Sequence, residues 1–327
     1  MPHLHWLLPG QPRTINDLKQ SNLASVRLRA AVALEAFSQD KWYISAGETV
    51  SSKCTVLVVG KIGGHDIQRR SENWLRQIAM AKAGKALVCL DYTDHHLGFE
   101  SAMSAFYREV LGLIDVCTVP STSMQELLRG YWQGPIKVIE DVLEIVPQAP
   151  KQISSSPVTA LWFGHSSNIP YLEQFLESSM RSLKHIRIIA LTNEIGVNWF
   201  IQAGKKLSAN ITVELGNWSV LNMLEAAKRS DLCLIPSDTR DIRKVGVSSN
   251  RLITALALGL PTAADLLPSY VHFQDYFVDI RSNHLSRLIT DPKEFHHAVI
   301  LFQRNIVPEF TELNLATKWL KLLNNQN

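Results

Sequence analysis

The chain has 327 residues, of which 46% are hydrophobic and 19% are charged, and its formal net charge is +3 with histidine neutral. This composition excludes a disordered chain and suits two globular domains of ordinary size. No apolar run is long enough to span a bilayer, and the first residues lack the basic and apolar regions of a secretory signal.

The small positive charge does not indicate a nucleic-acid partner, although it permits peripheral contact with an anionic membrane. The four cysteines are far apart and form no CxxC pair, so the sequence predicts buried thiols and no metal site. Reduced thiols are typical of a cytoplasmic protein. These cysteines are Cys54, Cys89, Cys117 and Cys233.

Short apolar runs alternate with amphipathic segments along the first half of the chain. The expected strands are 5–9, 41–46, 55–59, 86–90, 115–119 and 136–139. The expected helices are 23–37, 69–83, 99–111 and 124–129. This alternation predicts a parallel sheet with right-handed crossovers. In the first of these helices, we expect Arg27 and Arg29 to lie on the solvated face; the alternative is that they point into a cleft.

Polar residues gather after the strand 86–90, in the sequence Asp-Tyr-Thr-Asp-His-His. Because ligands of open α/β sheets bind at the carboxyl ends of the strands, we expect this cluster to contain catalytic residues. A carboxylate beside a histidine can act as a general base toward a hydroxyl. The catalytic candidates are Asp91, Asp94 and His95. The alternative interpretation is that Asp91 caps a local turn and the histidines are surface residues.

The segment 146–157 contains three prolines and three consecutive serines, which predicts a domain boundary near residue 150. The alternation then restarts. The expected strands are 158–163, 186–191, 211–215, 232–235 and 262–264. The expected helices are 169–183, 197–206, 220–229, 251–258 and 313–323.

A basic loop follows the strand 232–235, and Ser248 to Asn250 then supply N-cap candidates for the helix 251–258. A basic loop at the carboxyl end of a buried strand, leading into a helix N-terminus, is a physically sensible phosphate site. The alternative is an ordinary strand-loop-helix unit without a ligand. The basic residues are Arg240, Arg243 and Lys244.

Five segments of the chain resemble motifs of the GT-B glycosyltransferases, particularly glycosyltransferase family 4. They are TVPSTSMQELL, IKVIEDVLE, VTALWFGHSSN, LCLIPS and NRLITALALGLPT, in this order. The resemblance implies two Rossmann-like domains that face each other across a cleft. Residues 1–150 would form the acceptor-side domain, with 306–327 packing back on it. Residues 151–305 would form the nucleotide-sugar domain.

The resemblance also implies which residues contact each substrate. The acceptor-side residues are Gly10, Lys61 and Gly63, and the catalytic candidates Asp91, Asp94 and His95 would face the acceptor. Arginine in the helix 251–258 would add bidentate contacts to the donor diphosphate. The donor-binding residues are Gly164, His165, Thr192, Trp218, Ser237, Asp238, Lys244, Ser248, Ser249, Asn250 and Arg251.

The sequence departs from the family pattern at one important point. The family places glutamate at both ends of a Glu-x7-Glu pattern, whereas the matching positions here are Gly246 and Thr254. Neither residue can stabilise a developing positive charge as a carboxylate does. Asp238 or Asp241 could substitute from the loop, and the departure is also compatible with an inactive member of the family.

The predicted function is transfer of a sugar from a nucleotide-diphosphate sugar to a hydroxyl of a saccharide, lipid-linked or protein acceptor. We expect a hexosyltransferase that needs no metal or other cofactor, because the sequence has no DxD-like motif and the basic loop can replace a divalent cation. The alternatives are a sugar-nucleotide epimerase and a catalytically inactive partner protein. A nicotinamide-dependent dehydrogenase is disfavoured because the chain lacks a strand-associated GxGxxG motif.

Overall fold

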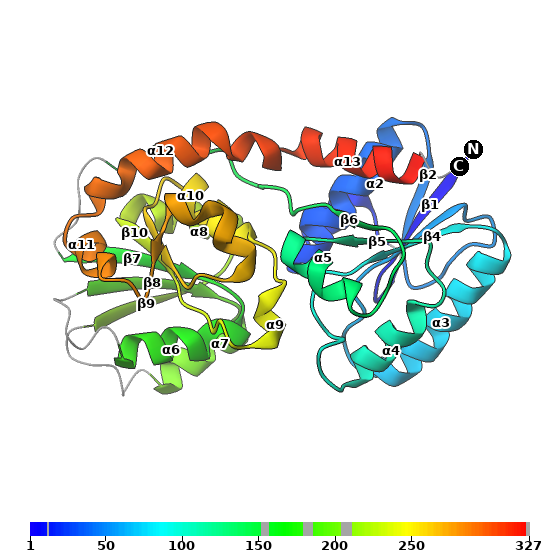
Figure 1. Cartoon of the computed structure of the whole chain (residues 1–327), viewed down its shortest axis with the longest axis horizontal. Helices are drawn as coiled ribbons and strands as arrows, with labels where there is room; N and C mark the ends of the chain where they lie inside the picture. Colours follow the sequence, from blue (N-terminus) through cyan, green and yellow to red (C-terminus); the bar gives the residue numbers. More distant parts are fainter. Residues whose placement is uncertain (12, 152–156, 179–185, 204–210, 325–327) are drawn as a thin grey trace. The chain divides into compact units, whose positions relative to one another are not determined.

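The computed structural model describes residues 1–11, 13–151, 157–178, 186–203 and 211–324. The chain divides into two compact units. The first unit comprises Met1–Glu144, Ile242–Ser249 and Glu309–Asn327, and the second comprises Ile145–Asp241 and Asn250–Pro308. Each unit contains a six-stranded parallel sheet with helices between the strands (Figure 1). The predicted α/β class with two Rossmann-like sheets is therefore confirmed.

The sheet of the first unit has the strand order β2-β1-β3-β4-β5-β6. Its strands are β1 (His3–Leu7), β2 (Tyr43–Gly47), β3 (Val56–Val59), β4 (Leu87–Asp91), β5 (Val116–Val119) and β6 (Ile136–Val138). Its helices are α1 (Ile15–Lys19), α2 (Ala31–Gln39), α3 (Ile67–Ala83), α4 (Ala102–Val110), α5 (Thr122–Arg129), α9 (Ile242–Val245) and α13 (Glu312–Asn324).

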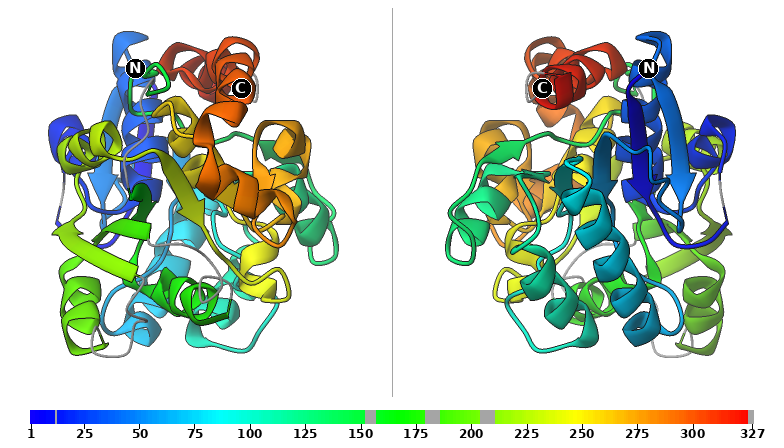
Figure 2. Two further views of the ribbon diagram at one scale, coloured as in Figure 1. Left: turned by 90° about the vertical axis from the view of Figure 1, so that its left-hand side faces the viewer. Right: turned by 90° about the vertical axis from the view of Figure 1, so that its right-hand side faces the viewer.

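Helices cover both faces of this sheet, because the strand side chains alternate between two apolar clusters. On one face Trp74 of α3, Tyr107 of α4 and Met124 of α5 belong to the same cluster as Leu57 of β3. On the other face α2 and α13 pack on the sheet, with the rings of Trp6 and Trp319 5.2 Å apart. The last helix thus packs on the first unit, as the resemblance implied, and Figure 2 shows α13 beside the helices drawn in blue.

The predicted helix 23–37 is interrupted by a π-helical turn, η1 (Val26–Ala30), before α2 begins. The expectation that Arg27 and Arg29 lie on a solvated face is wrong. Arg29 is fully buried, and Arg27 is mostly buried and forms an ion pair with Glu144, its Nε 2.5 Å from Oε2. Periodicity misses this arrangement because a π-turn shifts the register of the side chains on the helix.

The sheet of the second unit has the order β12-β11-β10-β7-β8-β9. Its strands are β7 (Val158–Phe163), β8 (Ile186–Thr192), β9 (Ile211–Asn217), β10 (Leu232–Ile235), β11 (Thr262–Ala264) and β12 (Val278–Asp279). Its helices are α6 (Ile169–Ser178), α7 (Glu194–Ala203), α8 (Val220–Arg229), α10 (Asn250–Ala257), α11 (His284–Thr290) and α12 (His296–Asn305). The short helices η2 (Ser166–Asn168), η4 (Pro268–Tyr276) and η5 (Pro292–Phe295) complete the unit, and η6 (Val307–Phe310) precedes α13.

One face of this sheet packs on α6, α7 and α11 through residues such as Leu172, Phe200 and Leu288. Helices α8 and α10 contact the strands of the same sheet, and α12 packs on α10. The predicted helix 197–206 begins three residues earlier, at Glu194. Residues 179–185 and 204–210, which the predicted helices 169–183 and 197–206 include in part, lie outside the described residues, as does 152–156 of the predicted linker.

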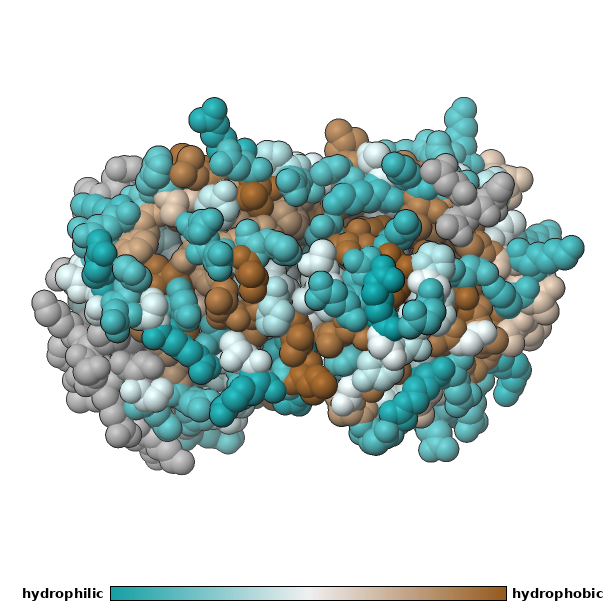
Figure 3. Space-filling view, in the orientation of Figure 1, coloured by the Kyte–Doolittle hydropathy of each residue, from teal (hydrophilic) through white to brown (hydrophobic). Residues whose placement is uncertain are grey.

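On the face shown in Figure 3, hydrophobic residues are interspersed among hydrophilic ones. In the described part of the chain, no helix combines the length and the hydrophobicity that crossing a bilayer requires.

Candidate functional site

The donor-side candidates of the second unit lie at one edge of its sheet. Gly164 follows β7, Thr192 ends β8, Trp218 follows β9 and Ser237 lies just beyond β10. Because the strands are parallel, their carboxyl ends meet at this edge, where open α/β sheets bind their ligands. The structure therefore brings these four predicted residues to one side of the second unit.

The turn after β7 is held by backbone hydrogen bonds. The Gly164 N–H donates to the Leu191 carbonyl at 3.0 Å, and the Ser166 N–H donates to Oδ1 of Asn193 at 3.0 Å. The His165 imidazole accepts from the Ser167 N–H at 3.2 Å, so it caps the short helix η2. Asn193 was missed by the sequence analysis, although it directly follows the strand that ends at Thr192.

Arg251, in the first turn of α10, lies against this glycine turn. A Cβ at position 164 would approach Cζ and Nη2 of Arg251 to 3.3 Å. The guanidinium carbon is 5.9 Å from the ring centroid of Trp162 and 6.0 Å from that of Phe163. The absence of a side chain at Gly164 thus leaves the space that the guanidinium occupies.

The Nε and Nη2 atoms of Arg251 are shielded from solvent and have no hydrogen-bond partner in the described part of the chain. Burial lowers the pKa of the guanidinium, and no carboxylate lies among the groups that act on it. A buried cation without a counter-anion is costly, and an anion that paired with it would offset part of that cost. The side chain as a whole is partly exposed, although its Nε and Nη2 are not.

The residues that precede Arg251 have differing surroundings. Ser249 is buried, and Ser248 hydrogen-bonds to the buried Asp141 of the first unit, to which the segment Ile242–Ser249 also belongs. Helix α10 begins at Asn250, one residue earlier than predicted. Lys244 lies in the last turn of the short helix α9.

Two predicted donor residues have roles in the local structure. Thr192 is fully buried, and its carbonyl accepts from the Trp218 N–H at 2.8 Å, so it joins the ends of β8 and β9. Asp238 accepts from the Arg240 N–H at 2.9 Å within its own loop. The Trp218 side chain is half-buried at the same edge of the sheet.

The sequence analysis missed Asp265, a buried carboxylate that directly follows β11. Its Oδ2 accepts from the Ser237 N–H at 2.7 Å, and its Oδ1 is 2.5 Å from Nε of Arg281. Asp265 therefore fixes the turn after β10. A carboxylate immediately beyond the short strand 262–264 was the available signal.

In the first unit, Asp91 ends β4 but is held inside the protein. Nε of Arg29 lies 3.0 Å from each of its carboxylate oxygens, and the Thr118 hydroxyl donates to Oδ1 at 2.8 Å. Arg29 also contacts the buried Asp141 at 3.2 Å. With both oxygens of Asp91 engaged and 2% of the residue exposed, this geometry favours an anchoring role over contact with an acceptor.

Asp94 is the accessible carboxylate of the cluster. Its side chain is 39% exposed and its Oδ2 lies 2.6 Å from Nζ of Lys61, which joins two of the predicted residues. Burial of the carboxyl acts to raise its pKa, but Lys61 outweighs this and holds the pKa below its usual range. Asp94 is therefore ionised at neutral pH and able to accept a hydrogen bond from a hydroxyl.

His95 is buried beside these residues. Its Nδ1 is 3.3 Å from the Tyr92 hydroxyl, which itself accepts from the Leu97 N–H at 3.0 Å. The Tyr92 hydroxyl hydrogen is then free to donate to Nδ1, which leaves the hydrogen of the neutral ring on Nε2. Burial lowers the pKa of His95, so the ring is neutral at pH 7. Neighbouring His96 stacks on Tyr107, with the ring centroids 5.4 Å apart.

The remaining acceptor-side candidates are glycines in turns. Gly10 has φ +96°, in the region that favours glycine, directly after the Pro9 carbonyl that accepts from Arg13 at 3.3 Å. Gly63 follows β3 on the same chain segment as Lys61, and no atom lies within 4 Å of a Cβ built there.

Gly246, where the motif of glycosyltransferase family 4 has glutamate, has close neighbours on its side-chain side. The Gly246 carbonyl accepts from the Ser121 hydroxyl at 3.0 Å, and a Cβ at position 246 would lie 2.8 Å from Sδ and Cε of Met124. All three residues belong to the first unit. The structure thus accommodates glycine at this position and no larger side chain without a shift of Met124.

In the described residues, histidine, cysteine, aspartate and glutamate side chains form no group of three or more that could hold a metal ion. The four predicted buried cysteines are all buried and free.

No protein-family model matches the sequence, and no curated protein matches it significantly. Solved structures do match the fold. HepE from Anabaena, in complex with UDP, is 10% identical, has a TM-score of 0.67, and the match covers 99% of this chain and 100% of that one. An alpha-glucosyltransferase in complex with UDP and a 13-mer DNA is 11% identical, with a TM-score of 0.63 and 99% of both chains covered.

TarM is also similar, at 13% identity and a TM-score of 0.57, with 90% of this chain covered. This chain spans 58% of the length of TarM. The two parallel six-stranded sheets and their interleaved helices are those of the GT-B fold shared by these proteins.

Proposed function

We propose that the protein is a glycosyltransferase that takes a sugar from a nucleotide-diphosphate sugar and passes it to a hydroxyl group. The observation that supports this most strongly is the buried guanidinium of Arg251, which has unpaired nitrogens beside Gly164 at the ligand-binding edge of the sheet. A diphosphate is the anion that fits such a group, because guanidinium donors match two phosphate oxygens at once. The UDP in two of the similar structures supports a uridine nucleotide as the first to test.

The proposed chemistry places Arg251 at the leaving group. Transfer passes through an oxocarbenium-like state as the nucleoside diphosphate departs, and negative charge grows on the departing phosphate. A preorganised cation at this point stabilises the transition state more than the ground state. The N-terminus of α10, with Ser248 to Asn250, would add backbone donors to the same phosphate. Lys244, Gly164 and His165 remain proposed donor contacts.

On the acceptor side, Asp94 is the proposed base, because it is ionised and exposed whereas Asp91 is enclosed by Arg29. His95 is 2% exposed, like Asp91, so its proposed role is to support the Asp94 cluster from inside the protein rather than to remove a proton. Gly10, Lys61 and Gly63 would border the acceptor. Acceptor classes remain a saccharide, a lipid-linked saccharide or a protein.

We also propose that transfer needs no metal, that it moves a hexosyl group, and that the protein is related to glycosyltransferase family 4. The support for metal independence is the cation at Arg251, which supplies positive charge where other enzymes use a divalent ion. A cytoplasmic location, with peripheral contact to an anionic membrane, fits the buried thiols and the mild positive charge. No contact with nucleic acid is proposed.

A second candidate is a catalytically inactive partner protein, and Gly246, in place of the glutamate of the family motif, favours it. A side chain at this position requires Met124 to shift, and the chain has glycine there, so any carboxylate that stabilises positive charge must come from elsewhere, such as Asp238 or Asp241. A sugar-nucleotide epimerase also stays compatible with the fold, although no separate observation favours it.

The test begins with a thermal-shift screen of nucleoside diphosphates, because a ligand that prefers the folded state raises the melting temperature. The best nucleotide is then supplied as its sugar conjugates, with and without hydroxyl acceptors. A transferred sugar supports the glycosyltransferase, an altered donor sugar without acceptor supports the epimerase, and binding without turnover supports the inactive partner. Failure of every nucleotide to bind contradicts the proposal.

A further inference from the structure

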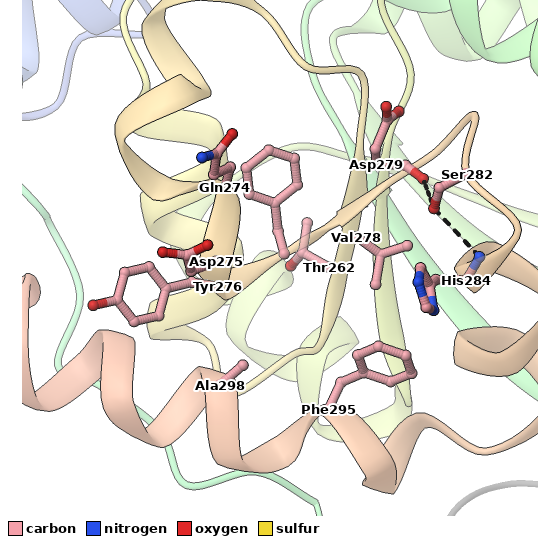
Figure 4. Close-up of a pocket in the computed structure, with 11 residues that line it drawn as sticks. Thr262, Gln274, Asp275, Tyr276, Val278, Asp279, Ser282, His284, Phe295 and Ala298 are labelled. Atoms are coloured by element: carbon pink, nitrogen blue, oxygen red, sulfur yellow. Dashed lines mark hydrogen bonds between the residues drawn. The ribbon is translucent and has the colours of Figure 1, made fainter.

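The second unit contains a cavity of about 360 Å³ that none of the proposed donor residues line. It lies against the amino ends of β11 and β12, where Thr262 and Val278 begin these strands. The end of η4 forms one wall, and Phe295 and Ala298 close the side of η5 and α12 (Figure 4). Its volume falls in the range of small-molecule sites, about 300 to 1,000 Å³.

Aromatic rings form much of the apolar surface of this cavity. Tyr276, Phe277 and Phe295 line it, and each is half-buried, so part of each ring is open to a ligand. Two of these rings pack against other aromatic rings of the same unit. Tyr276 packs edge-on against Phe302 at 5.4 Å, and Phe277 packs edge-on against Tyr270 at 6.2 Å. Braced rings present fixed apolar faces at little entropic cost to a ligand.

Polar side chains without partners surround these rings. Gln274, Asp275 and His284 line the cavity, and in the part of the chain that the structure describes their side chains make no hydrogen bond or ion pair. Figure 4 shows Gln274 and Asp275 on one side of the cavity and His284 on the other. Together they offer an amide, a carboxylate and an imidazole, which can donate to and accept from hydroxyl groups.

We propose that this cavity binds a neutral saccharide. The C–H face of a sugar ring is apolar and packs on aromatic rings, while its hydroxyls need planar polar partners around the rim, and the cavity supplies both. The carboxylates of Asp275 and Asp279, with no lysine or arginine among the lining residues, disfavour an anionic ligand such as a nucleotide or a sugar acid. The site is thus chemically distinct from the cationic one at Arg251, and the inference does not depend on the proposed transferase activity.

The experiment is saturation-transfer difference NMR on the full chain, with maltose, cellobiose and lactose as neutral probes and glucuronate as the anionic probe. We expect at least one neutral disaccharide to bind and glucuronate not to bind. Phe277→Leu keeps an apolar side chain but removes the ring, and we expect it to weaken binding at least tenfold. His297→Ala, which removes an exposed histidine of α12 outside the cavity, is the matched control and should leave binding unchanged.

If Phe277→Leu lowers the melting temperature, a second variant changes Asp275 and His284, two exposed polar residues at the rim of the cavity. Asp275→Ala combined with His284→Ala removes groups that have no partners in the described fold, so the fold should persist while saccharide binding is lost. UDP affinity, measured in parallel, should stay at the wild-type value in every folded variant. The proposal is overturned when no neutral probe binds, when glucuronate binds equally well, or when the rim variant binds like the wild type.

Discussion

Arg29 and Asp91 form a fully buried ion pair, in which Nη2 of Arg29 lies 2.6 Å from Oδ1 of Asp91 and Nε lies 3.0 Å from both oxygens. The pair joins the π-helical turn η1 to the end of β4. Arg29 also donates to the Ile139 carbonyl, which follows β6. One side chain therefore fixes the carboxyl ends of β4 and β6 beside the proposed acceptor residues.

Arg29→Met should destabilise the protein by about 3–5 kcal/mol, because it leaves Asp91 and Asp141 buried without their cation. Urea denaturation measures the change. Arg108→Met is the matched control, since Arg108 pairs with the exposed Glu100 on the surface, and we expect little change there. Equal losses of unfolding free energy in the two variants would show that the buried pair stabilises the protein no more than the exposed pair does.

The histidine pair of β1 should make stability depend on pH. Nε2 of His5 donates to the Gly47 carbonyl at 3.1 Å, so Nδ1 of the neutral ring accepts from the Ser45 hydroxyl at 2.7 Å. Burial lowers the pKa of His5 to about 4 from 6.5. Between these values the unfolded chain binds the proton and the folded chain does not, so stability is retained above pH 6.5 and falls as the pH drops toward 4.

The loss attributable to His5 over this window is up to about 3 kcal/mol. Urea unfolding of the wild type and of His5→Gln at a series of pH values separates this contribution from that of other groups. We expect a shallower acid loss in the variant. Parallel curves for the two proteins would rule out His5 as the source.

Gly246→Ala should destabilise the protein by about 1–3 kcal/mol, because the new Cβ would lie 2.8 Å from Met124 Sδ and 3.1 Å from its Cα. Gly112→Ala is the control, as the nearest atom to its Cβ is the Glu109 carbonyl at 3.5 Å. Gly246→Glu, which supplies the carboxylate of the family pattern, should fail to raise transfer activity. Increased transfer by Gly246→Glu would mean that Met124 yields readily and that the position is open to a functional side chain.

Asp94→Asn should lower the rate of transfer about 10²–10⁴-fold, the range for loss of a general base, while nucleotide affinity stays the same. Single-turnover kinetics and calorimetry distinguish the two effects. Asp91→Asn should instead lower stability, because Asp91 anchors Arg29. A normal rate in Asp94→Asn together with a slow rate in a folded Asp91→Asn would reverse the roles given to these two carboxylates.

The alternation of strands and helices could be predicted because apolar strand runs and helix caps are local signals. Ser219, for example, caps α8 by accepting from the Asn222 N–H at 3.0 Å. The boundaries were less accurate. β1 begins at His3 rather than at residue 5, because His3 is polar in sequence but is buried in the fold, where its imidazole bonds to Ser45.

The surroundings of the candidate site could be predicted only in part. The position of Arg251 at the start of a helix follows from its sequence context, whereas its nearness to Gly164 was implied by the resemblance to the GT-B glycosyltransferases. The burial of Arg29 and the partners of Asp265 could not be predicted, because each partner is more than ten residues away. Arg29 pairs with Asp91, and Asp265 binds Ser237 and Arg281. Long-range pairings of this kind produce no periodic pattern of residues in a single sequence.

Binding of the donor diphosphate by Arg251 can be measured by calorimetric titration of UDP into the wild type and into Arg251→Met. Methionine keeps an unbranched apolar stem and removes the charge. We predict that affinity falls at least about tenfold, as expected for loss of a charge-assisted hydrogen bond, while Arg287→Met, at an exposed pair of the same unit, binds UDP like the wild type. Unchanged affinity in a folded Arg251→Met would contradict the account.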